Sequence, residues 1–316
     1  MKESDEFSIL QKYFKNLGSQ FNDSSGILVG PGDDAGLFLA NKKDLIFSTD
    51  ISNADIHFPK NLNPNLIAYR ACCVAASDIP ACGGTLKWLS ISLVTPSKKI
   101  SWLKEFASGL KHFTKTYKVP IIGGDLVKGK ECSVSVGVCG EVNQKQFLSR
   151  KTAQAGDSIY VSGILGLAKL GLQLIKSKKK NLNLEEKKYV KKFLQPKVHT
   201  ILGENLRNIA NSCIDISDGL VGDLGHICEQ SNSRAEINID AIPYKGSYEE
   251  ALTWGDDYEL CFTVPENKEL KLSQICKKLK IKVFKIGQIT NGKGIKIYRG
   301  NKEIFLKKSS YNHLSQ

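Results

Sequence analysis

The stretch SCIDISDGLVGDLGHICEQ, residues 212–230, changes from a strand pattern to a helix pattern within a few residues. Its first part is short and apolar, as expected for a buried strand. Further along, Leu220, Leu224 and Ile227 recur at the spacing of one helix face. A strand that gives way to a helix across an acidic turn is a building unit of α/β folds.

The same alternation of strands and helices runs along the rest of the chain. We expect helices over 6–17, 64–77, 164–178, 185–194, 198–211 and 218–230, and strands over 44–49, 86–94, 119–123, 132–140, 157–163, 212–216, 235–240, 258–264, 282–289, 294–298 and 303–307. In 132–140 the valines alternate strictly, which favours a half-buried strand in an antiparallel or mixed sheet. The fold class is therefore α/β, with a mixed α+β character.

The chain has 316 residues, which at about 100–200 residues per domain suggests two domains. A polar stretch over 141–156 places the boundary between domains at 1–148 and 149–316. Hydrophobic residues make up 41% and charged residues 24% of the chain, which excludes a disordered protein.

The net charge is +13. Such an excess fits a nucleic-acid partner, an anionic surface or phosphorylated small molecules. Most of it comes from 176–197 and 266–308, which are rich in lysine and lie outside the acidic turns described below. We interpret it as a solvated lysine surface, and we find no motif that reads nucleic acid.

No apolar run is long enough to cross a membrane, and the N-terminus lacks the pattern of a signal peptide. The nine cysteines are odd in number and form no C-x-x-C pair, which fits reduced thiols better than disulfides or structural zinc. We therefore expect a cytoplasmic protein with no membrane partner.

Several familiar motifs are absent. Residues 124–131 (GDLVKGKE) nearly match a phosphate-binding P-loop, but Glu131 replaces the hydroxyl residue and a strand follows in place of a helix. The chain has no dinucleotide fingerprint after a strand, no G-x-S-x-G elbow and no H-E-x-x-H helix. Its five histidines show no metal-ligand spacing, and we expect all of them except His57 to be ordinary core or surface residues.

Acidic residues instead gather in turns at six places: Gly32-Asp33-Asp34, Ser48-Thr49-Asp50, Asp78, Gly123-Gly124-Asp125, Asp215-Ile216-Ser217-Asp218 and Gly255-Asp256-Asp257. An Asx-turn, a helix start or a helix end explains each place singly. Ser217, for example, would be an N-cap, and Asp78 would end the helix over 64–77. Together, carboxylates with hydroxyls and without Cys or His favour magnesium. Several magnesium ions suit a reaction between two phosphorylated partners.

The acidic clusters and their flanking residues also resemble a known family. The segments are GDDAGLF (32–38), STDISNADIHF (48–58), SDIPACGG (77–84), GGDL (123–126), DISDGL (215–220) and GDDYEL (255–260). Their order and spacing, along nearly the whole chain, resemble those of thiamine-monophosphate kinases. The resemblance implies a two-domain fold like that of aminoimidazole ribonucleotide synthetase. It also implies a homodimer whose N-terminal sheets join into a barrel-like interface.

The resemblance further implies an activity and a set of site residues. Family members transfer the γ-phosphoryl group of ATP to thiamine monophosphate, giving thiamine diphosphate, with several Mg²⁺ ions. The implied magnesium ligands are Asp34, Ser48, Thr49, Asp50, Asp78, Asp125, Asp215 and Asp218. The implied ATP contacts are Tyr117, Gly124, Asp125, Arg150 and Ser217, and the implied thiamine contacts are His57, Asp256 and Tyr311.

The chain departs from the family pattern in three places. The usual GGEDYEL has Trp254 for its first Gly and Asp256 for its Glu. The usual Gly-Ala-Arg before the second-domain strand reads TAQ at 152–154, which leaves Arg150 as the cation for ATP. The last motif, usually Gly-aromatic-x-His-Phe, reads SYNHL at 310–314.

We expect direct transfer without a general base, because a phosphate monoester is mostly dianionic at pH 7. Two alternatives share the fold: selenophosphate synthetase and aminoimidazole ribonucleotide synthetase. The first would need a reactive Cys near the N-terminus, but the first Cys is Cys72, inside an expected helix. The second fits the segments around His57 and Asp256 less well. A basic nucleic-acid-binding protein is the alternative from another class.

Overall fold

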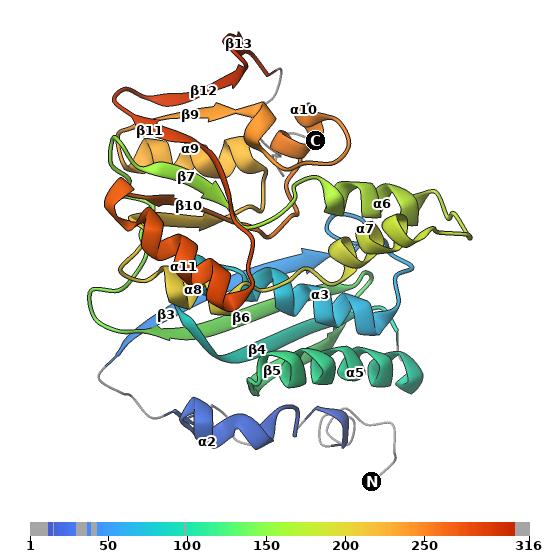
Figure 1. The fold of residues 1–316 in the computed structure, drawn as a ribbon. Coiled ribbons are helices and arrows are strands. Elements are labelled where there is room, and N and C mark those ends of the chain that lie inside the picture. The colour runs from blue at the N-terminus through green and yellow to red at the C-terminus, as the bar shows by residue number, and fades with distance from the viewer. Residues whose placement is uncertain (1–11, 15, 30–36, 39–42, 98, 307–316) are drawn as a thin grey trace. The chain divides into compact units, whose positions relative to one another are not determined.

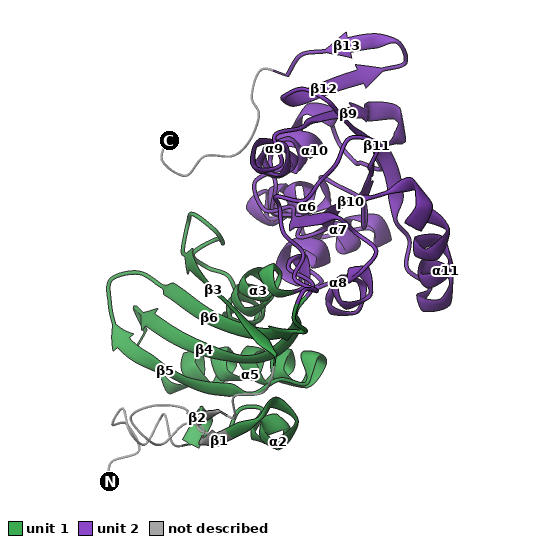
Figure 2. Cartoon of the chain, turned by 90° about the vertical axis from the view of Figure 1, so that its left-hand side faces the viewer, with its two compact units in different colours: residues 1–79, 84–144 green, residues 80–83, 145–316 purple. Residues whose placement is uncertain are grey.

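The computed structural model describes residues 12–14, 16–29, 37–38, 43–97 and 99–306. The chain divides into two compact units (Figure 2). Unit 1 consists of 1–79 and 84–144, and unit 2 consists of 80–83 and 145–316. The first unit thus ends at Gln144, near the predicted boundary at residue 148, and a short segment after Ile79 packs with unit 2.

Unit 1 is a four-stranded mixed sheet with helices on one side. Its elements are η1 (Ser19–Phe21), α2 (Asn22–Ser25), β1 (Ile27–Val29), β2 (Leu37–Phe38), β3 (Asp44–Asn53), α3 (Pro64–Ala76), β4 (Thr85–Thr95), α5 (Ile100–Tyr117), β5 (Ile121–Lys128) and β6 (Ser133–Val142), and α4 (Asp78–Ala81) continues into unit 2. The strand order is β3-β6-β4-β5, and only β4 and β5 run parallel. Helices α3 and α5 lie on the same side of this sheet (Figure 2). The strand over 132–140 was expected in an antiparallel or mixed sheet, and the sheet is mixed. The strand is not half-buried, because most residues on both of its faces are buried.

The two faces of this sheet differ in burial. Val134, Val136 and Val138 of β6 are at most 1% exposed, so the expected valine face is buried. On β3, the side chains of Phe47 and Ile51 point to the other face and remain exposed. Alternation along β3 therefore decides which of its polar residues lie on the helix-covered face.

Unit 2 is a seven-stranded sheet with helices on both faces (Figure 1). Its elements are β7 (Ser158–Val161), α6 (Leu167–Lys176), α7 (Leu184–Leu194), α8 (Thr200–Leu206), β8 (Ser212–Asp215), α9 (Leu220–Gln230), β9 (Arg234–Asn238), η2 (Ile239–Ala241), α10 (Tyr248–Thr253), β10 (Leu260–Val264), η3 (Glu266–Lys268), α11 (Glu269–Leu279), β11 (Phe284–Thr290), β12 (Gly294–Arg299) and β13 (Lys302–Ile304). The strand order is β13-β12-β9-β11-β7-β10-β8, and only β9 and β12 run parallel.

Alternation along β10 explains why its sequence is continuously apolar. Cys261 joins the core cluster that contains Leu224 and Ile227 of α9. Its neighbour Phe262 joins the other cluster, with Leu202 of α8. A strand covered on both faces needs apolar side chains at every position.

The structure corrects several expectations about single elements. Helices α5, α10 and α11 were not among the predicted elements. Asp78 does not end the helix over 64–77; it begins the separate short helix α4. Ser217 is not an N-cap, since α9 begins at Leu220 and Gly219 precedes it without a side-chain cap. The expected helix over 6–17 lies mostly outside the described residues.

No helix in the described part of the chain is long and apolar enough to cross a membrane.

Candidate active site

In unit 1, a hydroxyl and carboxylates meet beside β3. The Ser48 hydroxyl donates a hydrogen bond of 2.5 Å to Oδ2 of Asp78, the first residue of α4. Asp50 lies two residues along β3 from Ser48, so its side chain points to the same face. Both Asp50 and Asp78 are partly buried. Ser48, Asp50 and Asp78 therefore lie close to one another on the helix-covered side of β3. Asp34, another predicted ligand, lies outside the described residues.

The remaining metal-ligand candidates of unit 1 lie on the other face of the sheet. Thr49 is exposed and alternates with Ser48 and Asp50. Asp125 pairs with Ser92, which is in register with Ile51 through β6, so its side chain shares the exposed face with Ile51. The sheet thus does not bring the side chains of Thr49 and Asp125 together with Asp50.

Two ligand-contact candidates of unit 1 are held by local contacts. The backbone N–H of Asn53 donates to Nδ1 of His57 at 3.0 Å, and the N–H of His57 donates back to the Asn53 carbonyl at 2.9 Å. Because Nδ1 accepts, the proton of a neutral ring sits on Nε2. The ring of Tyr117 lies 4.7 Å from that of Phe113 at the end of α5. Gly124 lies in β5, in register with Ile91 of β4.

In unit 2, the loop between β8 and α9 gathers three carboxylates. Asp215 is the buried last residue of β8, and Asp218 lies three residues on. Asp223, in the first turn of α9, is 3% exposed, and its Oδ2 accepts the N–H groups of Asp218 and Gly219, each at 3.1 Å. Burial, and then the charges of Asp215 and Asp218, raise the pKa of Asp223 to about 8. Asp223 was not among the predicted site residues, although its position in the first turn of a helix favours a functional carboxylate.

A second loop, residues 255–259, runs alongside this one. The N–H of Asp256 donates to the Ser217 carbonyl, and the N–H of Tyr258 donates to the Ile216 carbonyl, both at 2.8 Å. The N–H of Ile216 returns a bond of 2.8 Å to the Glu259 carbonyl. The predicted thiamine contact Asp256 and the predicted ATP contact Ser217 are therefore joined through the backbone.

Close approach of the two loops requires glycine at 255. Its φ is +81°, and a Cβ there would lie 2.1 Å from the Ser217 carbonyl oxygen. Asp256 and Tyr258 also have positive φ, 65° and 49°. For residues with side chains this conformation costs on the order of 1–3 kcal/mol each, and such strain is concentrated at functional sites.

The next two acids of this segment point inward. The carboxylate of the fully buried Asp257 accepts the N–H of Gly166, just before α6, through both oxygens at 3.1 and 2.9 Å. Burial raises the pKa of Asp257 to about 7. The carboxylate of Glu259 lies 2.7 Å from Nε2 of His199 and forms an ion pair with Lys192. Burial would raise the pKa of Glu259, but Lys192 and the hydrogen-bonded His199 outweigh burial and hold this pKa well below its usual range.

These contacts were not foreseen, since His199 was expected to be an ordinary core or surface histidine. Of the other predicted residues, Arg150 is exposed, and its carbonyl accepts the Ser231 hydroxyl at 2.8 Å. Tyr311 lies outside the described residues. Trp254, the departure from the family pattern, stacks under Lys169, whose Nζ is 3.6 Å from the ring centroid and 2.8 Å from Glu250.

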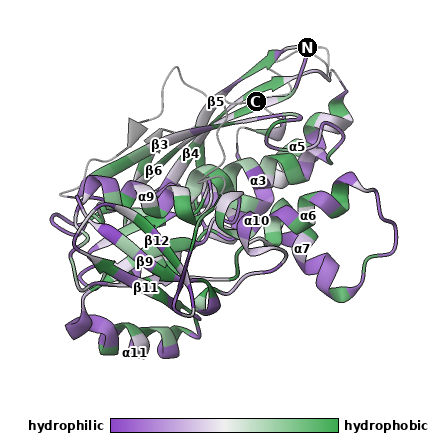
Figure 3. Ribbon diagram, turned by 90° about the horizontal axis from the view of Figure 1, so that it is seen from above, coloured by the Kyte–Doolittle hydropathy of each residue, from purple (hydrophilic) through white to green (hydrophobic). Residues whose placement is uncertain are grey.

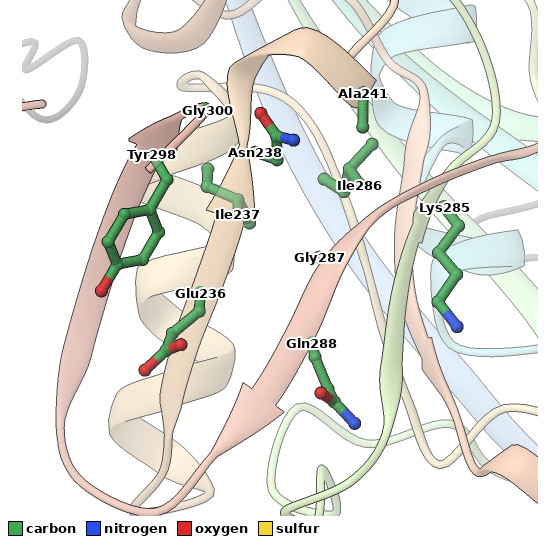
Figure 4. A pocket seen from close by; sticks show the side chains of 10 residues that line it. All are labelled: Glu236, Ile237, Asn238, Ala241, Lys285, Ile286, Gly287, Gln288, Tyr298 and Gly300. Carbon is green, nitrogen blue, oxygen red and sulfur yellow. The ribbon is translucent and has the colours of Figure 1, made fainter. Parts of the chain in front are cut away.

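Unit 2 also has an open hollow of about 450 Å³ over β9, β11 and β12 (Figure 4). Tyr298, Glu236 and Lys285 are among its lining residues. Glu236 accepts the Thr290 hydroxyl, and Lys285 pairs with Glu269 at 2.9 Å. None of the predicted site residues lines this hollow, so it is separate from the acidic loops.

The donor chemistry fits magnesium. Ser48, Asp50, Asp78, Asp215 and Asp218 offer only oxygen atoms. Within the described ranges, no group of three or more His, Cys, Asp or Glu side chains is placed to hold an ion. Mg²⁺ typically uses one or two carboxylates and completes its shell with water and substrate phosphates, so pairs of carboxylates suffice.

Comparisons with known proteins agree with this architecture. Residues 32–142 match the family of AIR synthase related proteins, N-terminal domain, and residues 154–300 match the corresponding C-terminal domain. The fold and the acidic loops therefore define an AIR synthase related protein.

Individual relatives show which family within this class the chain resembles most specifically. Thiamine-monophosphate kinase of Buchnera aphidicola subsp. Schizaphis graminum is 39% identical, over 98% of this chain and 99% of the relative. The crystal structure of the Stenotrophomonas maltophilia K279a enzyme of that name has a TM-score of 0.84 at 31% identity, over 92% and 95% of the two chains. A structure described as AaThiL complexed with AMPPCP and TMP has a TM-score of 0.77 at 28% identity, over 99% and 98%. This chain belongs to the thiamine-monophosphate kinase family.

Proposed function

We propose that this protein transfers the γ-phosphoryl group of ATP to thiamine monophosphate, giving thiamine diphosphate and ADP. The proposal rests on the relatives of that name and on the relative solved with AMPPCP and TMP. The observation that carries it is the hydrogen-bonded pairing of the loop with Asp215 and Asp218 to the loop with Asp256. This pairing sets acidic metal-ligand candidates beside a candidate acceptor contact.

The acceptor phosphate is mostly a dianion at pH 7, because its second pKa is about 6. No side chain has to remove a proton, so we expect direct in-line transfer without a phosphorylated protein. When bound, magnesium supplies positive charge that offsets the repulsion between the phosphate groups. The chain's own residues position the two substrates.

The residue roles follow from the family motifs. The proposed magnesium ligands are Asp34, Ser48, Thr49, Asp50, Asp78, Asp125, Asp215 and Asp218. The proposed ATP contacts are Tyr117, Gly124, Asp125, Arg150 and Ser217, and the proposed acceptor contacts are His57, Asp256 and Tyr311. Among the magnesium ligands, the hydrogen bond between Ser48 and Asp78 and the gathering of Asp215 with Asp218 support the assignment.

We also propose a cytoplasmic homodimer. All nine cysteines are free thiols, as a reducing compartment favours. The outer face of the unit 1 sheet exposes Leu45, Phe47, Ile51 and Val127, and exposed apolar patches of this kind are typical of association surfaces.

The alternative of a selenophosphate synthetase is less well supported. That enzyme class would need a reactive thiol, whereas Cys72 is fully buried in α3. Burial and the neighbouring Cys73 raise the pKa of Cys72 well above its ordinary value. A thiol protonated at neutral pH is a poor nucleophile.

A product assay tests the proposal. The full chain is incubated with ATP, magnesium and thiamine monophosphate, and the products are separated by chromatography. We expect one thiamine diphosphate per ADP, and no product when a chelator removes the metal. A folded protein that makes no thiamine diphosphate would contradict the proposed activity.

A further inference from the structure

The segment after Gly255 holds a strained backbone next to a buried charge network. Asp256 and Tyr258 have positive φ, which side chains disfavour. A backbone of this kind persists only where the surrounding structure holds it in place. Directly after residues 256–258, the side chain of Glu259 contacts Ser162, Lys192 and His199.

Glu259 is tied to three separate segments of unit 2. The Ser162 hydroxyl, just after β7, donates to its Oε2 at 2.6 Å. Nε2 of His199, just before α8, lies 2.7 Å from the same oxygen, and Lys192 of α7 binds Oε1. A Cβ on Gly163 would lie 2.5 Å from the Glu259 carboxyl carbon, so glycine leaves the room that this carboxylate occupies.

The network is buried and its members depend on one another. The side chains of Glu259 and His199 are 8% and 5% exposed, and that of Lys192 is 13% exposed. Nδ1 of His199 has no hydrogen-bond partner among the described residues, so the ring is held through Nε2. Loss of the carboxylate would remove the ion-pair partner of Lys192, whose ammonium group is largely shielded from solvent.

The backbone of Glu259 connects this anchor to both acidic loops. Its carbonyl accepts the N–H of Ile216, and the preceding residue, Tyr258, donates to the Ile216 carbonyl. Two residues upstream of Tyr258, Asp256 donates to Ser217. The side chain of Glu259 therefore fixes the end of a short ladder whose other end carries Asp256.

We propose that Glu259 is a positioning residue that holds Asp256 in the conformation needed to bind the phosphorylated acceptor. This inference rests on the proposed function, because it takes Asp256 as an acceptor contact. Glu259 itself touches neither substrate.

The test compares Glu259→Gln with Asp157→Asn in the full chain. Asp157 is also buried in unit 2, where it accepts from Gln154, Asn211 and Thr263, but it contacts neither loop. We expect Glu259→Gln to raise the KM for thiamine monophosphate about tenfold, with the KM for ATP within about twofold of wild type. Asp157→Asn lowers the Tm and leaves both KM values unchanged.

Lys192→Met provides a milder second variant in case Glu259→Gln does not fold. It removes one of the partners of Glu259, and we expect it to raise the acceptor KM in the same direction by about threefold. Unchanged acceptor KM values in the folded variants would overturn the inference. So would an equal rise in Asp157→Asn.

Amide hydrogen exchange separates this inference from the proposed function. Without substrates, we expect Glu259→Gln to speed exchange in peptides covering 255–260 at least about tenfold, and Asp157→Asn to leave them unchanged. Faster exchange in a protein that makes no thiamine diphosphate would refute the activity and support the anchoring role. Unchanged exchange in that segment would overturn the anchoring role even if the wild type is active.

Discussion

At the scale of single residues, the buried acids Asp257 and Glu259 of unit 2 have pKa values that shift in opposite directions. Lys192 and His199 face Glu259, and despite burial they hold its pKa well below its usual range. Burial raises the pKa of Asp257, two residues earlier, to about 7. The carboxyl group of Asp257 accepts a single backbone N–H, that of Gly166. Opposite pKa shifts predict opposite effects of pH on stability.

Replacement of Asp257 by Asn tests whether the raised pKa of Asp257 makes the stability of the protein depend on pH. The native protein keeps a proton on Asp257 that the unfolded chain, with a pKa of about 3.9, releases. Stability from this group therefore falls as pH rises from about 4 to about 7. Asn does not titrate, so its contribution to stability does not change with pH. The free energy of unfolding of Asp257→Asn minus that of wild type should therefore rise by up to about 3 kcal/mol between pH 5 and pH 8.

Thermal and urea unfolding at the two pH values measure this change. Asp240→Asn, at an exposed acid of the same unit, is the control and should show no comparable trend. A stability difference between Asp257→Asn and wild type that is the same at both pH values would show that Asp257 does not titrate in this range.

The predicted metal-ligand role of Asp50 is tested by Asp50→Asn. An amide keeps the size of the side chain but loses the charge that binds a hard cation. We expect kcat/KM to fall about a hundredfold or more at saturating magnesium, while the Tm stays close to wild type. Asp44→Asn, at an exposed acid of the same strand, should remain active. Near-normal turnover by Asp50→Asn would mean that Asp50 does not bind the metal.

The sequence predicted which turns carry acids, but not which acids face inward. The loop with Asp215 and Asp218 lies where the strand-to-helix pattern of 212–230 places it. The contact between Glu259 and Lys192 joins residues 67 positions apart, and no local pattern specifies it. A register difference of one residue likewise separates Thr49 from Asp50, and only the pairing of strands shows which face each occupies.

At the scale of elements, helix α5 was not predicted, although its sequence has a clear helical periodicity. Leu103, Phe106, Leu110 and Phe113 recur at helical spacing, and all four are at most 3% exposed. Strong periodicity was therefore present in 100–117. In contrast, α4 has only four residues and begins one residue after the C-cap of α3, so sequence periodicity could not separate the two helices.

Gly255→Ala tests whether the two acidic loops of unit 2 must approach closely. A methyl group would collide with the Ser217 carbonyl at 2.1 Å, and the positive φ adds strain. We expect the free energy of unfolding to fall by about 3 kcal/mol or more, with a large loss of activity. Urea unfolding and the product assay measure the two effects.

Gly156→Ala is a matched control, since Gly156 also has a positive φ, +97°, but nothing lies within 4 Å of its Cβ position. It should cost only the strain of a left-handed alanine, about 1–2 kcal/mol, and leave activity intact. If the two variants are equally stable, the approach of the loops contributes nothing beyond the conformation of the glycine.

At the scale of the whole molecule, the basic excess lies on exposed positions of unit 2. Lys277, Lys278 and Lys280 at the end of α11, and Lys187 and Lys188 of α7, are all exposed. Figure 3 shows hydrophilic segments alternating with hydrophobic ones along both helices. None of these lysines is among the predicted site residues, which agrees with a solvated surface.

The exposed apolar face of unit 1 leads to a prediction about assembly. Phe47 is 65% and Ile51 55% exposed on the same side of β3, and an apolar face of this kind is stabilised when a second copy covers it. A glutamate buried in such an interface would lack a partner, so Phe47→Glu should raise the dimer dissociation constant at least about tenfold. Sedimentation velocity over a range of concentrations measures it. Phe305→Glu, at an 84% exposed phenylalanine of unit 2, should stay dimeric. A wild-type monomer at micromolar concentration, or a Phe47→Glu dimer as tight as wild type, would show that this face is not the interface.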